Sequence, residues 1–176
     1  MGAVNTAMIA AGGYDGTSLQ AITEQYNGSS WTEVGDMNTA KSQGAASGQA
    51  PYQNSIMFGG GPAVAAAETW NGSSWTEVAD LNTTRNNMSG SGTTPAGLIF
   101  GGSVGASNTG KTETWNGSAW SEVNDLNTVR SDLAGATNGT TTATLAFGGS
   151  GVSAANESWN GSSWTEVGDV NQERMD

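Results

Sequence analysis

Residues 70–82 read WNGSSWTEVADLN, and close copies of this stretch occur at three other places in the chain. The copies are YNGSSWTEVGDMN at 26–38, WNGSAWSEVNDLN at 115–127 and WNGSSWTEVGDVN at 159–171. Measured between their Asn-Gly pairs, the successive spacings are 44, 45 and 44 residues. A fixed period of this length is typical of architectures that repeat and stack one supersecondary unit.

Each repeat predicts four short β-strands. Upstream of each copy lies an apolar run that ends in a Gly pair, at residues 7–13, 55–60, 97–102 and 144–149. Such runs indicate buried strands followed by a turn that needs positive φ. Three of them are preceded by small residues, GAASG at 44–48, MSGSG at 88–92 and LAGATNG at 133–139. The unit is therefore a strand of small residues, an apolar strand, a Glu-x-aromatic strand and a Trp-x-Glu-Val strand.

Four antiparallel strands per repeat are the content of one propeller blade. We predict an all-β fold, a four-bladed β-propeller forming a single domain over residues 1–176. The repeats occupy 1–40, 41–84, 85–129 and 130–173, and residues 174–176 join the first blade, so that the N- and C-terminal segments share it and close the ring. Small residues in the innermost strands favour a small ring. The alternatives are an eight-bladed ring shared by two chains and a solenoid.

The Gly pair, the aromatic residue and Trp that flank the turn, and the Arg that follows resemble the kelch motif, and the resemblance covers essentially the whole chain. It implies propeller blades but no particular function, because kelch propellers serve unrelated roles. The chain departs from common kelch proteins in having four repeats, where six or seven are usual, and a shorter turn. The NGSSWTEV variant is also similar to repeats in environmental and marine-virus proteins, which suggests association with a virion.

The charge of the chain argues against two classes of partner. Five Lys and Arg stand against 16 Asp and Glu, for a formal net charge of −11. Binding to nucleic acid or to an anionic membrane requires basic patches, so neither is expected. The start of the chain has no basic segment before its apolar stretch, and no apolar run approaches the length of a membrane span. We therefore expect a soluble chain without a signal peptide.

The sequence contains neither His nor Cys. This excludes Ser-His-Asp and Cys-His relays and the copper chemistry of kelch-type oxidases. Glycosidase chemistry needs only two carboxylates, but here the same carboxylates recur in every repeat, which favours a structural role. The repeated Asp residues lack the dense spacing of calcium loops, so we expect turn capping and no metal or cofactor. They are Asp36, Asp80, Asp125 and Asp169.

Three kinds of side chain recur at fixed positions, and we interpret them as structural. The glutamates are Glu24, Glu68, Glu113 and Glu157, the tryptophans are Trp31, Trp75, Trp120 and Trp164, and the cations are Lys41, Arg85, Arg130 and Arg174. We predict that each of these glutamates pairs with one cation, within its blade or across to the next, and that Arg174 closes the ring.

Two registers are open for the hairpin around the Asn-Gly pair. A type I′ turn at Asn71-Gly72 places Glu68 opposite Trp75. A type II′ turn at Gly72-Ser73 instead pairs Trp70 with Trp75 and places Glu68 opposite Glu77, which sets like charges against each other.

Specific contacts are expected where the repeats differ. The connections after the Gly pairs vary in length and sequence, and so do the turns around Pro51-Tyr52 and Thr93 to Pro95. Tyr14, Asp15, Tyr52 and Lys111 are the candidate ligand contacts there. The expected function is a non-enzymatic structural or interaction module, on a viral particle or tail, with a protein or glycan partner. A carbohydrate-binding propeller is the alternative and a glycosidase ranks third. We expect a monomer rather than a dimer.

Overall fold

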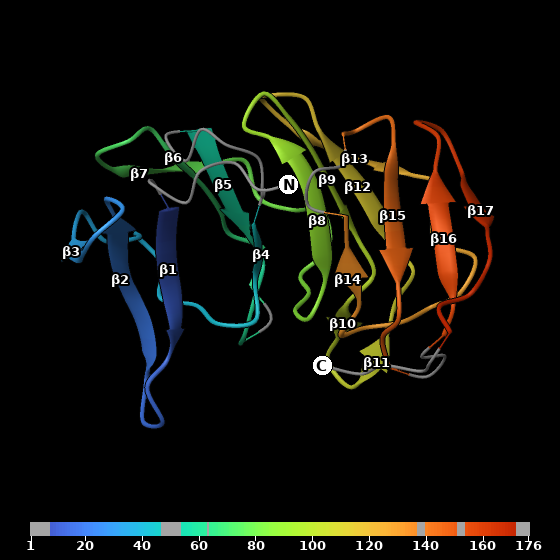
Figure 1. Ribbon diagram of the computed structural model, residues 1–176, viewed down its shortest axis with the longest axis horizontal. Helices are drawn as coiled ribbons and strands as arrows, with labels where there is room; N and C mark the ends of the chain where they lie inside the picture. Colours follow the sequence, from blue (N-terminus) through green and yellow to red (C-terminus); the bar gives the residue numbers. More distant parts are fainter. Residues whose placement is uncertain (1–7, 47–53, 63, 137–139, 151–153, 172–176) are drawn as a thin grey trace.

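The computed structural model describes residues 8–46, 54–62, 64–136, 140–150 and 154–171. These residues form β-strands in antiparallel sheets with almost no helix (Figure 1). In this part of the chain nothing helical has the length and apolar character needed to cross a bilayer. The all-β class predicted from the sequence is confirmed.

Four of the sheets follow the repeats. The first contains β1 (Met8–Tyr14), β2 (Leu19–Tyr26) and β3 (Trp31–Glu33), and the second contains β4 (Ala45–Ala46), β5 (Ser55–Phe58), β6 (Ala67–Trp70) and β7 (Trp75–Val78). The third contains β8 (Ser89–Thr93), β9 (Ala96–Phe100), β12 (Thr112–Trp115) and β13 (Trp120–Val123), and the fourth contains β14 (Ala134–Gly135), β15 (Thr144–Phe147), β16 (Asn156–Trp159) and β17 (Trp164–Glu166). A small ribbon of β10 (Ser103–Val104) and β11 (Ser107–Asn108) lies in the connection from β9 to β12.

In each of these four sheets the strands are hydrogen-bonded in chain order and run antiparallel. The second, third and fourth sheets thus have the four strands expected of one repeat. The first sheet has three described strands. The segments expected to complete it, at the start of the chain and at residues 174–176, lie outside the described residues.

The hairpin register is the second of the two alternatives. Trp70 pairs with Trp75 and Glu68 pairs with Glu77, and the equivalent residues pair in the other three sheets. The side-chain Oδ1 of Asn71 accepts the backbone N–H groups of the two serines that follow Gly72, at 2.9 Å each. Gly72 has φ of 99°, a conformation that costs an L-residue energy and glycine little.

Each sheet has two faces, because successive side chains of a strand point to opposite sides. We call front face the one that carries the repeated Glu and Trp, and back face the other. The front face of the second sheet packs on the first sheet, with Trp70, Trp75 and Met57 against Met37. The front faces of the third and fourth sheets pack in the same way on the back faces of the second and third.

Small residues are required where the first strands of the sheets meet. Strand β8 lies beside both β4 and β14. A Cβ added at Gly90 would come within 2.7 Å of the Phe58 ring, and one at Gly135 within 2.6 Å of the Ser89 hydroxyl. At both positions glycine is therefore needed to let the strands approach.

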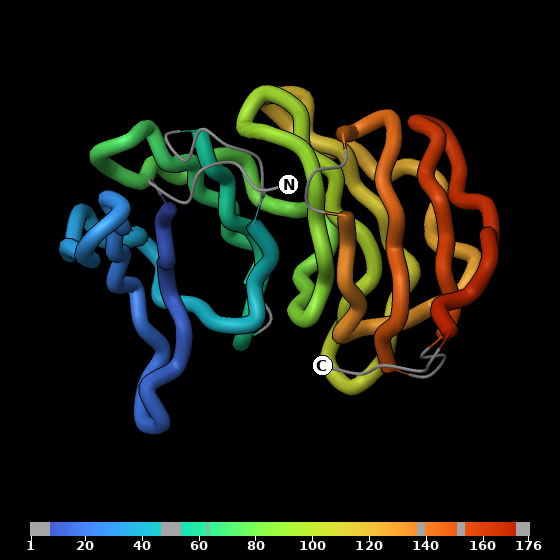
Figure 2. The backbone as a smooth tube through the Cα atoms, viewed as in Figure 1, coloured from blue at the N-terminus to red at the C-terminus, as the bar shows by residue number. Residues whose placement is uncertain are grey.

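The four sheets succeed one another along the longest axis of the molecule (Figure 1). The first sheet, in blue, lies at one end and the fourth, in orange and red, at the other, and the tube in Figure 2 runs from one to the other. Among the described residues, apolar clusters join the first sheet to the second, the second to the third and the third to the fourth. The front face of the first sheet and the back face of the fourth are the two end faces of this row.

Candidate functional site

Buried charged side chains cluster at the interfaces between successive sheets, where a buried cation pairs with a buried glutamate. The ion pairs are Lys41 with Glu68 at 3.2 Å, Arg85 with Glu113 at 2.7 Å and Arg130 with Glu157 at 3.0 Å. All six side chains are fully buried. The predicted pairing is confirmed for these three cations, while Arg174 lies outside the described residues.

The Arg85 site shows which groups surround a buried charge, although its Nε has no hydrogen-bond partner among the described residues. Its Nη2 donates to Oε1 of Glu113, and its Nη1 donates to the backbone oxygens of Lys111 and Gly101. The other oxygen of Glu113 accepts from the backbone N–H and the Nδ2 of Asn82, at 2.8 and 3.0 Å. Burial lowers the pKa of Arg85, and the charge of Glu113 opposes that shift. Arginine still carries its proton at neutral pH.

An asparagine of the preceding sheet completes each pair, and the sequence interpretation gave it no role. Asn38, Asn82 and Asn127 donate from their backbone N–H and from Nδ2 to the glutamate of the next sheet. Their recurrence in the same positions of each repeat is the signal that could have identified them. Each Glu, cation and Asn set therefore ties one sheet to the next.

In the second, third and fourth sheets, the tryptophan of the last strand packs on the back face of the preceding sheet. Trp75 donates its indole N–H to Thr23 Oγ1 at 2.9 Å, and Trp164 donates to Thr112 Oγ1 at 3.0 Å. The residue equivalent to these threonines in the second sheet is Ala67, and the buried Nε1 of Trp120 has no partner in the described part of the chain. The tryptophans also stack edge-on against phenylalanine: Trp120 on Phe58 and Trp164 on Phe100, with ring centroids 5.4 and 4.9 Å apart.

The repeated aspartates act on backbone groups. Oδ1 of Asp36 accepts the N–H of Thr23, and Oδ1 of Asp125 accepts that of Thr112. Thr23 and Thr112 each lie 13 residues before the aspartate, in strands β2 and β12, so these contacts join the segment after the last strand of the sheet to the neighbouring strand and differ from the turn capping expected from the sequence. Within the described residues no three carboxylates lie close enough together to share a metal ion.

The candidate ligand contacts predicted from the sequence differ in exposure and in bonding partners. Tyr14 is 62% exposed at the end of β1. Asp15 accepts the N–H groups of Thr17 and Ser18, and these backbone bonds lower the pKa of its carboxyl. Lys111 forms an ion pair with Glu122 at 2.7 Å on the surface, and Tyr52 lies outside the described residues. Of these side chains, Tyr14 is the one that the structure presents to solvent without a role in the fold.

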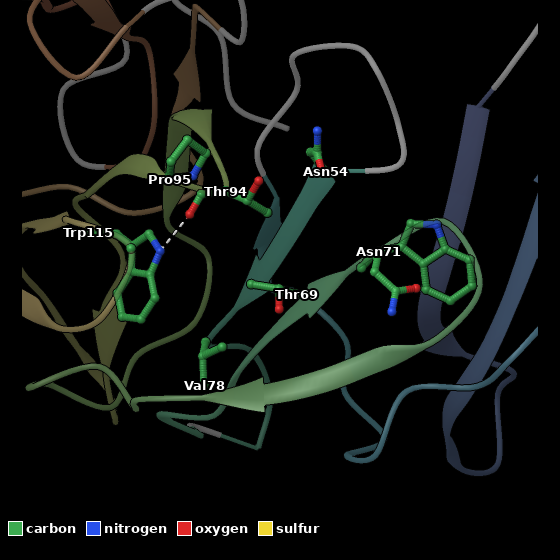
Figure 3. A pocket seen from close by; sticks show the side chains of 9 residues that line it. Asn54, Thr69, Asn71, Val78, Thr94, Pro95 and Trp115 are labelled. Carbon is green, nitrogen blue, oxygen red and sulfur yellow. Dashed lines mark hydrogen bonds between the residues drawn. The ribbon is translucent and has the colours of Figure 1, made fainter.

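A pocket of about 390 Å³ lies between the second and third sheets (Figure 3). Asn54, Thr69, Asn71 and Val78 come from the second sheet and its turns. From the third sheet, Trp115 lines the pocket but is 3% exposed, and its indole N–H donates to the backbone oxygen of Thr94 at 2.7 Å. The Trp115 ring is thus almost fully buried, and the rest of the lining combines amides and hydroxyls with apolar groups such as Val78 and Pro95.

Comparison of the chain with the models of known protein families, and with curated proteins, finds no match.

Proposed function

We propose that the four sheets are blades of a kelch-type β-propeller and that the chain is a non-enzymatic structural or interaction module. The observation that carries this proposal is the use of the recurring glutamates. Glu68, Glu113 and Glu157 are fully buried and paired with cations between the sheets. A carboxylate in that position holds two sheets together, and substrate does not reach it.

Closure of the blades into a ring is the part of this proposal that depends on the ends of the chain. It requires the front face of a first sheet to meet the back face of a fourth, either within one chain, through the terminal segments that would share one blade, or between two chains. The terminal segments lie outside the described residues. The blade assignment itself is supported by the strand order, the repeated register and the three equivalent interfaces.

A partner would contact the connections that differ between repeats. The turn from β1 to β2 presents Tyr14, and the ribbon of β10 and β11 presents Val104, which is 41% exposed. Large aromatic and apolar side chains on short, well-anchored turns are suited to contacts with another protein. Attachment to a viral particle or tail, suggested by the similarity of the repeats, is the setting that we propose for this module.

Binding of a carbohydrate is the second candidate, favoured by the amides and hydroxyls among the groups that line the pocket between the second and third sheets. A glycan array distinguishes the two. We expect no glycan to bind, and a signal abolished by Asn71→Ala and Thr69→Val would replace the protein-interaction proposal with a lectin. Aryl glycosides incubated with the chain test the enzyme alternative: release of the aryl group, lost in Glu122→Gln, would contradict a non-enzymatic role.

A further inference from the structure

The two end faces of the row of sheets carry the same complementary features as the internal interfaces. On the front face of the first sheet, Met8, Ile22 and Trp31 are 44%, 42% and 46% exposed. Trp31 is equivalent to Trp75, Trp120 and Trp164, whose exposures are 8%, 6% and 5%. The difference arises because those three tryptophans have a preceding sheet to pack against and Trp31 has none in the described structure.

The back face of the fourth sheet has a cavity at the position where the internal interfaces place a tryptophan. A cavity of about 420 Å³ is lined by Phe147, Asp169, Val170 and Asn171. Phe147 precedes its Gly pair as Phe58 and Phe100 precede theirs. In the last two internal interfaces this phenylalanine contacts the indole of the next sheet, Phe58 with Trp120 and Phe100 with Trp164.

A buried side-chain oxygen without a hydrogen-bond partner lies on the same face of the fourth sheet. Asn156 occupies the position of Thr23 and Thr112, which accept the indole N–H of the next sheet. Its Nδ2 donates to the backbone oxygen of Gly168 at 3.2 Å, while its Oδ1 is buried with no partner in the described part of the chain. A buried acceptor without a donor is costly, and an indole N–H placed as in the internal interfaces would satisfy it.

The polar side chains of the two end faces are also complementary. Asn171 is equivalent to Asn38, Asn82 and Asn127, which donate to the glutamate of the next sheet. Glu24, equivalent to those glutamates, is exposed on the front face of the first sheet. Stacking the first sheet on the fourth would therefore join Glu24 to Asn171 and would remove Leu145 and Val167, which are 38% and 40% exposed, from water.

We propose that the back face of the fourth sheet binds the front face of the first sheet of a second copy of this chain, with Trp31 of that copy stacked on Phe147 and its indole N–H donated to Asn156. A second copy is the occupant because the first and fourth sheets of one chain lie at opposite ends of the molecule (Figure 1). The contact is heterologous, since it joins two different faces, and two chains that pair at both ends close a ring of eight sheets. The monomer expected from the sequence is the competing arrangement.

Light scattering on the size-exclusion peak of the full chain tests the pairing. We expect a mass of at least twice the 17.8 kDa of one chain. Trp31→Glu and Leu145→Glu, each on one end face, should both reduce it to one chain, while the exposed control Val129→Glu keeps the larger mass. Near-ultraviolet circular dichroism of each variant shows whether the other tryptophans stay packed.

Mixing the two monomeric variants gives the sharper result. The Trp31→Glu chain retains an intact fourth sheet and the Leu145→Glu chain an intact first sheet, so an equimolar mixture should regain a one-to-one complex. A symmetric contact between two first sheets would give no such rescue and would overturn the proposal.

The state of the Trp31 indole separates the remaining outcomes. Iodide quenching of the chain, compared with Trp31→Phe, should show Trp31 shielded in the assembly. A mass of one chain with Trp31 shielded would mean that the chain closes on itself, and a mass of one chain with Trp31 accessible would mean that the end faces stay open. Either result overturns pairing with a second copy.

Discussion

At the scale of single residues, the fold depends on charges buried in pairs. Glu113 and Glu122 are direct cross-strand partners with opposite surroundings. Glu113 is fully buried against Arg85, whereas Glu122 is about half exposed and pairs with Lys111. Breaking a buried pair leaves one charge without compensation, while an exposed pair contributes little.

Glu113→Gln should therefore lower the free energy of unfolding by about 3 kcal/mol, because the Arg85 charge stays buried without its counterion. Glu122→Gln, on the facing position of the same hairpin, is the matched control and should change it little. Urea denaturation followed by tryptophan fluorescence measures both. Equal effects of the two substitutions would contradict the role given to the buried pair.

The surface pair of Lys111 and Glu122 predicts a pH dependence. The hydrogen bond to Lys111 lowers the pKa of Glu122 from its ordinary 4.5, and the same bond raises the pKa of Lys111 from its ordinary 10.5. The contribution of Glu122 is thus complete above pH 4.5 and lost as pH falls through its folded pKa, while that of Lys111 is complete below pH 10.5 and lost as pH rises through its folded pKa.

The melting temperature of Lys111→Met should consequently fall below that of the unaltered chain at neutral pH, and the difference should vanish in strong acid. High salt should also reduce it, because the pair is exposed. A difference that persists in strong acid would assign the effect to packing of the lysine side chain instead of its charge.

At the scale of elements, the interfaces between sheets share the same contacts, but single contacts are missing at some of them. The second sheet presents Ala67 where its neighbours present Thr23 and Thr112, so the indole N–H of Trp120 is buried without an acceptor among the described residues. Ala67→Thr should add the missing hydrogen bond. The matched control Ala67→Val adds the same volume without an acceptor.

We expect Ala67→Thr to be more stable to denaturant than Ala67→Val by about 1 kcal/mol, the net value of one such bond. The comparison cancels the effect of filling the site, since the two side chains have nearly the same shape. If valine were as good as threonine, the threonines of the other interfaces would be packing residues only.

The hairpin turns predict a second effect at this scale. Gly117 has φ of 94°, and an added Cβ would meet no atom closer than 3.6 Å, so only the backbone conformation opposes a side chain. Gly117→Ala should destabilise the chain by about 1–2 kcal/mol. Gly168, which lies in open space without a positive φ, is the control when both substitutions are made in the Trp31→Glu background, where no second copy covers it. Gly168→Ala should then leave the thermal midpoint unchanged or slightly raised.

At the scale of the whole molecule, stability is a sum over neighbouring sheets, as in other repeat proteins. The first sheet is held to the rest of the described chain by one interface, centred on Lys41 and Glu68, while the second and third sheets have two each. Loss of that interface should loosen the first sheet before the others.

Lys41→Met, made in the Trp31→Glu background so that self-association is removed, should accelerate amide hydrogen exchange in β1 to β3 and leave β12 and β13 protected. Lys111→Met in the same background is the control, because its ammonium pairs at the surface. Uniform acceleration throughout the chain would show that the four sheets unfold as one unit.

The sequence by itself determined the elements. The repeated WNGSSWTEV stretches, the Gly pairs and the small residues before them predict the strands, their order within each sheet and the pairing of Glu68, Glu113 and Glu157 with a cation, because these follow from local preferences and from the period. Two hairpin registers were left open, since both satisfy the Asn-Gly turn. Only the packed structure selects the one that pairs Trp70 with Trp75.

Only the tertiary structure decided how the sheets meet. The roles of Asn38 and Thr23 depend on which face of one sheet contacts the next, and nothing in a single repeat specifies that. The same holds for the ends of the row. Trp31 has the same local sequence as Trp75 yet is 46% exposed instead of 8%, because burial is set by a neighbour that the residue's own strand does not encode.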